Sequence, residues 1–524
     1  MKKLLTNLSL TPNKQELKAL LTSFIIINFT YLYHTLNFMW GNHDVYYVKY
    51  NTELSSGLFE GRFTQFILPA LLTNGQILPI INNLIAFIFL TLGLYILAKY
   101  FKLQSTFLTL TLFISFFCTQ PYTISILYFA FISISCFAWL FFSILGLYLS
   151  SQIPTSSPKL PLSIASIICF YLPLGGYPPV INTFFVCLSA KITLDIIFER
   201  PSIKSLYHTY KYTIINIIIA SILFKITLYF LPLKEVYNME LTPLLNLPQK
   251  FISTLKISFS QFFISQPFMP KSYKILLAIM SFTAIFGALN LKNTLKTRLL
   301  ILFFIIITIW FSSLTTFLVT PPTEFVSRID FYGFALLYAF FLLLLINLSP
   351  QIFNSLGIIL SFILIFLNII NNYHAQYVWY EGFKHEMKIL ESINERIESH
   401  PNFNPLHQYR VYQAGDITMR PIYYNQKFDK NEPFLLTLPY LAMWQTKNLL
   451  EFNSSTQYIS AKHTILPQDI TKDVYDFIIN QSRVWPEKNS IYIQDNIIII
   501  ILNSLGQDEL KQKVKKLYKL INHN

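Results

Sequence analysis

The stretch LPIINNLIAFIFLTLGLYILA, residues 78–98, decides the class of fold, because it carries no charged side chain from its first residue to its last. A helix of about 20 such residues is long enough to cross a hydrocarbon layer about 30 Å thick. Comparable stretches recur along the first two thirds of the 524-residue chain, which is 53% hydrophobic and 13% charged. Soluble domains carry about 25% charged residues. The sequence therefore predicts a polytopic α-helical membrane protein.

About eleven spans are predicted, and many Tyr and Trp residues lie at their ends, where amphipathic rings favour the membrane interface. The fourth span is long for one crossing, so it is predicted to be tilted, kinked or extended beyond the bilayer. The spans cover approximately residues 18–38, 78–98, 103–119, 122–149, 160–175, 178–197, 212–231, 273–290, 298–318, 331–348 and 352–371.

The placement of the basic residues predicts the orientation of the chain. The net charge is +14, and many of the Lys and Arg residues lie in short loops between spans. That pattern is typical of topology signals and not of a surface that binds nucleic acid. With eleven spans these loops share one side, which the positive-inside rule makes the cytoplasm. The N-terminus is thus predicted inside, and the first loop, residues 39–78, and the C-terminal part outside.

The character of the sequence changes near residue 373. Residues 1–372 are predicted to form the transmembrane domain, and residues 373–524 a small external α+β domain of ordinary size. Apolar residues recur at three- and four-residue spacing between Met387 and Ile397, which predicts an amphipathic helix that Pro401 stops. The other elements predicted there are a hairpin of residues 490–494 and 497–502 and a closing helix with a basic face over 508–521.

The sequence lacks the motifs that are typical of several kinds of chemistry. It has no Gly-rich phosphate loop, no nucleotide-binding fingerprint and no HExxH, so we expect neither a cofactor nor a metal. Acidic residues are nearly absent from the predicted spans, which weighs against an ion-coupled transporter. The four cysteines lie in or beside the spans as small apolar residues, without a CxxC pair, at Cys118, Cys136, Cys169 and Cys187.

The segment MWGNHDVYYVKY, residues 39–50, directly follows the first span and holds the first candidate site residues. In one interpretation Asp44 is a general base, and His43, Tyr46 and Tyr47 contact a sugar. In the other, which composition alone favours, Asp44 is a solvated loop acid beside interfacial aromatic residues.

Two arginines on the predicted external side are candidates for phosphate binding, because the guanidinium fork matches phosphate oxygens. Arg62 lies in LFEGRFTQF, residues 58–66, where Glu60 is a candidate ion-pair partner and a candidate contact of the sugar or acceptor. Arg328 lies in SRID, just before a late span. The alternative is that both arginines extend to lipid headgroups.

Gly and Pro interrupt the chain in LPLGGYPPV, residues 172–180, between the fifth and sixth spans. The simpler interpretation is a tight turn. The alternative is a broken segment that lines a cavity, with Tyr177 facing the site.

The order and common sidedness of these motifs resemble one protein family. The motifs are HDVYY at 43–47, EGRF at 60–63, GYPP at 176–179 and SR at 327–328, followed by the tail YIQDNIIIIIL at 492–502. Together they resemble the bacterial glucosyltransferase type II (Gtr) family, which modifies O-antigen, and more broadly the GT-C class of membrane glycosyltransferases.

This resemblance implies an inverting transferase of the bacterial inner membrane, with a polyprenyl-phosphate-sugar donor and an external glycan acceptor. Asp44 matches the acid of the first loop, and Arg62 and Arg328 match the family's arginine positions. One departure is that family members often have neighbouring acids in this loop, whereas here His43 precedes Asp44 and the next acid is Glu53. That departure puts a metal-binding role in doubt.

Two other function classes remain open at this stage. A lipid-linked glycan transporter or a polymerase would share the membrane body, but a flippase needs a polar path through its spans. A structural or sensory membrane protein with an outer binding domain is the third possibility. Convergence of Asp44, Arg62 and Arg328 on one external cavity would distinguish the enzyme.

Overall fold

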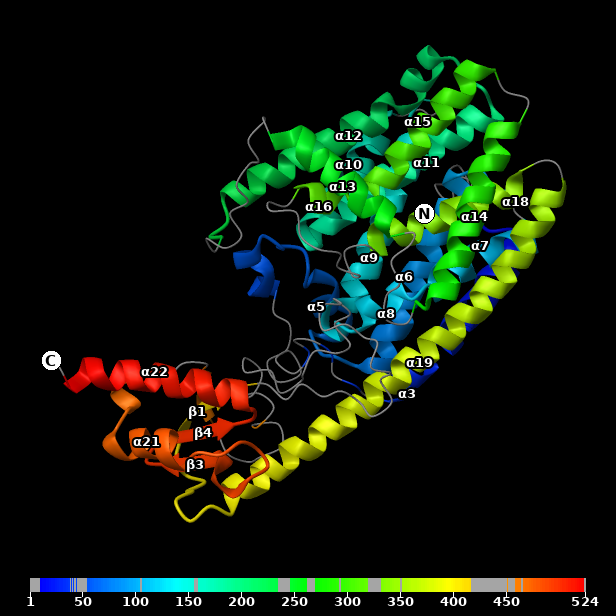
Figure 1. Cartoon of the computed structure of the whole chain (residues 1–524). Coiled ribbons are helices and arrows are strands. Elements are labelled where there is room, and N and C mark those ends of the chain that lie inside the picture. The colour runs from blue at the N-terminus through cyan, green and yellow to red at the C-terminus, as the bar shows by residue number, and fades with distance from the viewer. Residues whose placement is uncertain are drawn as a thin grey trace. The chain divides into compact units, whose positions relative to one another are not determined.

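The structure is a computed structural model, and α19 (Gln351–Glu398) passes from one of its two compact units to the other (Figure 1). The first unit comprises residues 1–38, 52–376 and 428–434, and the second comprises 39–51, 377–427 and 435–524. The structure describes residues 10–37, 39, 41, 44, 54–103, 106–154, 159–233, 246–261, 269–291, 294–318, 331–348, 351–415, 450, 458–462 and 465–522.

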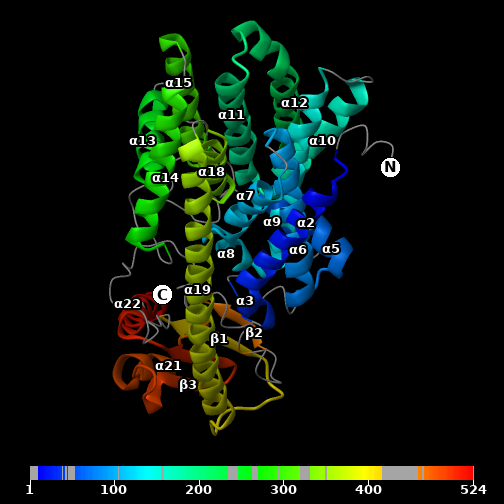
Figure 2. The same cartoon turned by 90° about the vertical axis from the view of Figure 1, so that its right-hand side faces the viewer.

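The secondary-structure elements that the structure describes in the first unit are helices. Its core is formed by α9, which packs most extensively against α6 and α10, while α2 packs against α6 and α7 (Figure 2). Besides the first part of α19, its helices are α2 (Lys14–Thr30), α3 (Leu32–Leu36), η1 (Leu54–Glu60), α5 (Ile67–Thr73), α6 (Pro79–Tyr100), α7 (Phe107–Thr119), α8 (Tyr122–Leu127), α9 (Ala130–Gln152), α10 (Lys159–Gly176), η2 (Pro178–Val180), α11 (Ile181–Phe198), α12 (Ile203–Tyr229), α13 (Leu247–Ser260), α14 (Lys271–Asn290), α15 (Leu295–Phe311), α16 (Leu314–Leu318), η5 (Phe331–Ala335) and α18 (Leu336–Asn347).

Seven helices in the described part of the chain are long and apolar enough to cross a membrane. They are α6, α9, α10, α11 together with η2, α12, α14 and α19. Several other predicted spans coincide with shorter apolar helices, such as α7 and the helix over Phe331–Asn347. The chain is therefore a membrane protein with several spans, and the expected total of about eleven stays a prediction.

The long fourth span is interrupted in the structure. Helix α8 ends at Leu127 and α9 begins at Ala130, and Phe129 between them has φ −118° and ψ 67°, outside the helical region. The backbone of this span is therefore kinked, which is one of the three alternatives predicted for it.

Buried acids within the helices of the first unit are held in ion pairs. Lys99 pairs with Glu16, which is 1% exposed, and the Tyr95 hydroxyl donates to the same carboxylate at 3.2 Å. Lys191 pairs with Asp195 one turn along α11. Pairing offsets the cost of burying charge, so these acids have a structural explanation.

The second unit contains a sheet whose described strands have the order β2-β1-β4-β3. Strand β1 (Tyr409–Ala414) is parallel to both β2 (Tyr458–Lys462) and β4 (Ile497–Ile501). Strand β3 (Ile491–Gln494) forms an antiparallel hairpin with β4, and Asp495 in its turn has φ +49°. This hairpin agrees with the one predicted from the sequence.

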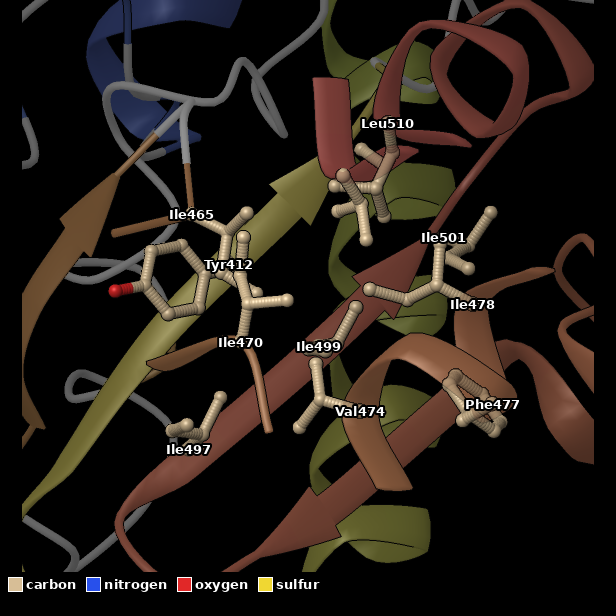
Figure 3. Close-up of a cluster of buried hydrophobic side chains, with 12 residues drawn as sticks. Tyr412, Ile465, Ile470, Val474, Phe477, Ile478, Ile497, Ile499, Ile501 and Leu510 are labelled. Carbon is tan, nitrogen blue, oxygen red and sulfur yellow. The ribbon is translucent and has the colours of Figure 1, made fainter. Parts of the chain in front are cut away.

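The core of the second unit lies on one face of this sheet (Figure 3). Ile497, Ile499 and Ile501 alternate along β4 and pack in a cluster with Leu510 of α22 (Ser504–Asn522) and Val474 of α21 (Lys472–Asp476). All five residues of β4 are buried, as expected for a central strand covered on both faces. The predicted closing helix over 508–521 is present and begins four residues earlier, at Ser504.

A buried carboxylate fixes one end of β1. Asp469 is 3% exposed, and its two oxygens accept from Arg410 at 2.5 Å and from the Tyr412 hydroxyl. Burial and this hydrogen bond raise the pKa of Tyr412 to about 12, so the hydroxyl remains a donor at neutral pH.

Candidate functional site

The EGRF segment forms a tight turn that requires glycine at two places. Glu60 ends η1, and Gly61 follows with φ +72°, a conformation that L side chains rarely adopt. The backbone N–H of Arg62 then donates to the Gly57 carbonyl at 2.9 Å. A Cβ at Gly57 would lie 2.3 Å from the Arg62 carbonyl oxygen, so this approach excludes any other residue. The turn therefore fixes the backbone at Arg62.

Thr64 attaches this turn to the end of α10. Its backbone N–H donates to the Gly175 carbonyl at 2.9 Å, and its hydroxyl donates to the Leu172 carbonyl at 2.6 Å. The Phe63 ring lies directly over Gly175, where a Cβ would approach it to 2.5 Å. The turn and the end of α10, far apart in the sequence, are thus held together by both hydrogen bonds and close packing.

Tyr177 lies at the break between α10 and η2, where its backbone is extended with φ −149° and ψ 91°. Its side chain is buried, at 4% exposure. Gly176 permits this arrangement, because a Cβ there would lie 2.1 Å from the Trp139 Nε1. The GGYPP sequence therefore forms a turn between consecutive helices whose tyrosine points into the protein.

The arginine and the tyrosine, both proposed from separate motifs, meet in the structure. The Arg62 Cζ lies 5.7 Å from the centroid of the Tyr177 ring, and one guanidinium nitrogen is 3.3 Å from the Glu60 carboxylate. The side chains of Arg62 and Glu60 remain 32% and 34% exposed. Among the described residues the guanidinium contacts only this carboxylate and this ring, so most of its five N–H donors face neither partner.

Tyr332 is the fourth member of this group and was missed by the sequence reasoning. Its ring centroid lies 5.5 Å from that of Tyr177, and its hydroxyl donates to the Cys136 carbonyl at 2.9 Å. It belongs to η5, a π-helical turn, a feature often found at functional sites. We call Glu60, Arg62, Tyr177 and Tyr332 the Arg62 cluster.

Asn182, which the sequence analysis also did not identify, fixes the chain on the C-terminal side of the break between α10 and η2. Its Oδ1 accepts from the Thr315 N–H and hydroxyl, both at 2.8 Å, and its Nδ2 donates to the Ser312 carbonyl at 3.2 Å. These bonds tie the start of α11 to α16 and to the end of α15. The segment carrying Tyr177 is thus held between two hydrogen-bonded contacts.

Asp44 belongs to the second unit, whereas the Arg62 cluster belongs to the first. Asp44 is 1% exposed, and one of its carboxylate oxygens accepts a hydrogen bond from the Gly41 N–H at 2.7 Å. The Asp44 N–H in turn donates to the Gly41 carbonyl at 3.4 Å. The carboxylate therefore closes a local turn. The other predicted site residues, His43, Tyr46, Tyr47 and Arg328, lie outside the described residues.

The Arg62 cluster is suited to binding an anion. A guanidinium held on one side by a carboxylate keeps its other donors available for phosphate oxygens. The Tyr177 ring, 4% exposed, lies against that charge, and the fully buried Tyr332 ring packs against Tyr177. In the described part of the chain, no group of three or more His, Cys, Asp or Glu side chains is placed to hold a metal ion.

Comparisons with known proteins identify the family. No curated protein and no solved structure matches the chain. Residues 33–346 match the family described as Glucosyl transferase GtrII, which confirms the resemblance seen in the motifs. The matched region is more than half of the chain and contains all four residues of the Arg62 cluster. The protein therefore belongs to the GtrII family of glucosyltransferases.

Proposed function

We propose that this protein is an inverting glycosyltransferase of the bacterial inner membrane. It moves a glucosyl or similar hexosyl group from a polyprenyl-phosphate donor to a glycan acceptor, such as O-antigen, on the external side. The observation that carries the proposal is the Arg62 cluster, in which a partly exposed guanidinium lies beside a buried tyrosine in the membrane-embedded unit.

Arg62 has the properties needed to bind the donor phosphate. When the bond between the sugar C1 and the phosphate oxygen breaks, the electron pair stays on the phosphate, where negative charge develops. A fixed guanidinium stabilises that charge without reorganisation during the reaction. Glu60 orients the guanidinium from one side. In the predicted orientation, the turn and the end of α10 both lie at the external face.

Tyr177 is proposed to contact the sugar, and Tyr332 to hold Tyr177 in place. The two tilted rings lie 5.5 Å apart, with Tyr177 4% and Tyr332 0% exposed, so Tyr332 supports Tyr177 from within the protein. The buried position of Tyr177 and its place under Arg62 would set the sugar at a fixed distance from the phosphate-binding group.

Asp44 is proposed as the base that takes the proton of the acceptor hydroxyl, and Arg328 as a second phosphate ligand. The hydroxyl oxygen then bonds to C1 on the face opposite the phosphate, which inverts the anomeric carbon. A phosphate is a good leaving group, so no general acid is needed. Base assistance of this kind contributes about 10²- to 10⁴-fold in rate. His43, Tyr46 and Tyr47 are proposed to contact the sugar or the acceptor.

A transfer assay tests the proposal. It uses the purified full-length protein, polyprenyl-phosphate glucose with a labelled sugar and a panel of acceptor glycans. Removal of one fixed donor to a developing oxyanion costs about 10²- to 10³-fold, so Arg62→Gln should lower kcat/KM for the donor by at least about 100-fold. Arg200→Gln, which changes an exposed arginine outside the cluster, is the matched control and should stay within about twofold of wild type.

Transfer by Arg62→Gln at the wild-type rate would reject the assigned role of Arg62. Loss of transfer in Asp44→Asn with donor binding intact is expected, whereas more than about a tenth of wild-type turnover would reject Asp44 as the base. A wild-type protein that neither transfers the sugar nor binds the donor would favour the transporter or polymerase instead.

A further inference from the structure

Helix α22, the last element of the second unit, has a buried face that is already occupied. Leu510 and Val514 pack into the core of the unit, and Tyr518 stacks on Tyr475 with ring centroids 4.1 Å apart. The acids Asp508 and Glu509 are exposed and precede the lysines along the helix. The fold therefore accounts for one side of α22.

The opposite side of α22 is basic along the rest of its length. Lys511, Lys515 and Lys519 recur every four residues and so follow one side of the helix, with Lys516 beside them. Lys515, Lys516 and Lys519 are exposed, and no acidic residue follows Glu509. In residues 465–522, as the structure describes them, these four lysines form no ion pair. We call Lys511, Lys515, Lys516 and Lys519 the lysine face.

An exposed leucine continues this surface at the end of the helix. Leu520 lies one turn beyond Lys516 and is 55% exposed, whereas Ile521 lies one turn beyond Leu517, on the side that packs into the core. An exposed leucine beside several lysines suits a membrane surface, where the lysines meet the headgroups and the leucine meets the apolar boundary below them.

We propose that the lysine face of α22 binds the anionic phosphate headgroups of the membrane that the first unit spans. Continuous helix α19 links the two units, so the second unit stays at a high effective concentration near lipid. The charge of the lysines complements anionic headgroups. Leu520 enters the boundary between headgroups and acyl chains, which favours a lipid surface over a soluble anionic glycan. This inference does not depend on the proposed transfer reaction.

The test uses the full-length protein in nanodiscs, which expose both membrane faces. Gln512, an exposed residue among the lysines, is changed to Cys and labelled with an environment-sensitive fluorophore. The four native cysteines are buried, and the labelled wild type measures any background. Quenching by neutral acrylamide is compared in phosphatidylcholine discs and in discs that also contain phosphatidylglycerol.

We expect the quenching constant to fall by about twofold or more in the anionic discs and to recover in about 0.5 M NaCl, where the Debye length is about 4 Å. Lys515→Gln/Lys519→Gln in the labelled protein should abolish the protection. Lys472→Gln/Lys488→Gln, which removes two exposed lysines elsewhere in the same unit, is the matched control and should keep it.

Equal quenching in both kinds of disc would overturn the proposal. So would protection that appears only when an anionic glycan is added, because the occupant would then be the glycan. Protection that is unchanged in Lys515→Gln/Lys519→Gln would also overturn it. All labelled proteins are compared by thermal unfolding, so that loss of the fold is not mistaken for loss of lipid binding.

Discussion

At the scale of single residues, we expect sugar transfer to depend on the aromatic ring of Tyr177 more than on the volume of its side chain. The ring lies under the Arg62 guanidinium and against the Tyr332 ring. A cation–π contact is worth about 0.5 to 2 kcal/mol, so Tyr177→Leu should lower kcat/KM for the donor by about two- to thirtyfold. Tyr177→Phe keeps the ring and should keep most of the transfer rate. An equal loss in both variants would show that the hydroxyl is the essential group.

The sequence alone identified those residues of the Arg62 cluster whose neighbours in the chain are unusual. Arg62 and Glu60 flank a glycine in a polar turn, and Tyr177 lies in a run of Gly and Pro, so their neighbours indicate an unusual backbone. Tyr332 and Asn182 lie inside apolar stretches that differ little from any other span. Their roles depend on contacts between distant segments, such as the hydrogen bond from Tyr332 to the Cys136 carbonyl, and no local pattern encodes those contacts.

At the scale of elements, Thr64 is a positioning residue that holds the Arg62 turn on α10. Thr64→Val removes the hydroxyl donor to the Leu172 carbonyl, in a residue that is 3% exposed. Loss of a buried hydrogen bond costs about 1 to 3 kcal/mol, so thermal unfolding in detergent should shift to lower temperature. Because the turn also carries Arg62, kcat should fall as well.

Rescue separates positioning from simple destabilisation. Thr64→Ser keeps the hydroxyl and should restore kcat, even if the lost methyl group keeps the unfolding temperature low. A Ser variant as inactive as the Val variant would assign the defect to packing and reject the role of the hydrogen bond.

The predicted elements were reliable where the sequence itself marks their ends. The Asp-Asn turn placed the β3–β4 hairpin correctly, and the five isoleucines after it form a buried strand. The long fourth span was predicted to be tilted, kinked or extended, and it breaks at Phe129. The sequence did not give the position of the break, because residues 128–130 contain neither Pro nor Gly.

At the scale of the whole molecule, the chain passes between its two units within one helix. The predicted domain boundary at residue 373 follows a real change of composition, from an apolar run to polar residues. That change ends the apolar stretch and does not end the helix, because nothing at this point breaks the backbone hydrogen bonding of α19. A boundary between units that lies inside a continuous helix is therefore not marked by turn-forming or helix-breaking residues in the sequence.

A row of buried amides attaches α19 to the first unit just before that boundary. Asn372 donates to the Thr119 carbonyl at 2.6 Å. Gln376 donates to the Thr30 carbonyl at 2.8 Å and accepts from the His34 N–H at 2.9 Å. Both amide residues are fully buried, at 0% exposure, on one face of the helix. These bonds join α19 to α7, α2 and α3.

Gln376→Leu should destabilise the first unit and leave the second unchanged. The substitution leaves the His34 N–H and the Thr30 carbonyl without their partner, at a cost of about 1 to 3 kcal/mol each. Hydrogen exchange followed by mass spectrometry should show faster exchange in α2, α3 and the first part of α19. Strands β1 and β4 should keep their protection, because the second unit has its own core around Ile499. Gln351→Leu, at the exposed start of α19, is the control and should change neither unit. Faster exchange in both units of Gln376→Leu would mean that they unfold as one cooperative structure, with α19 transmitting the loss from one to the other.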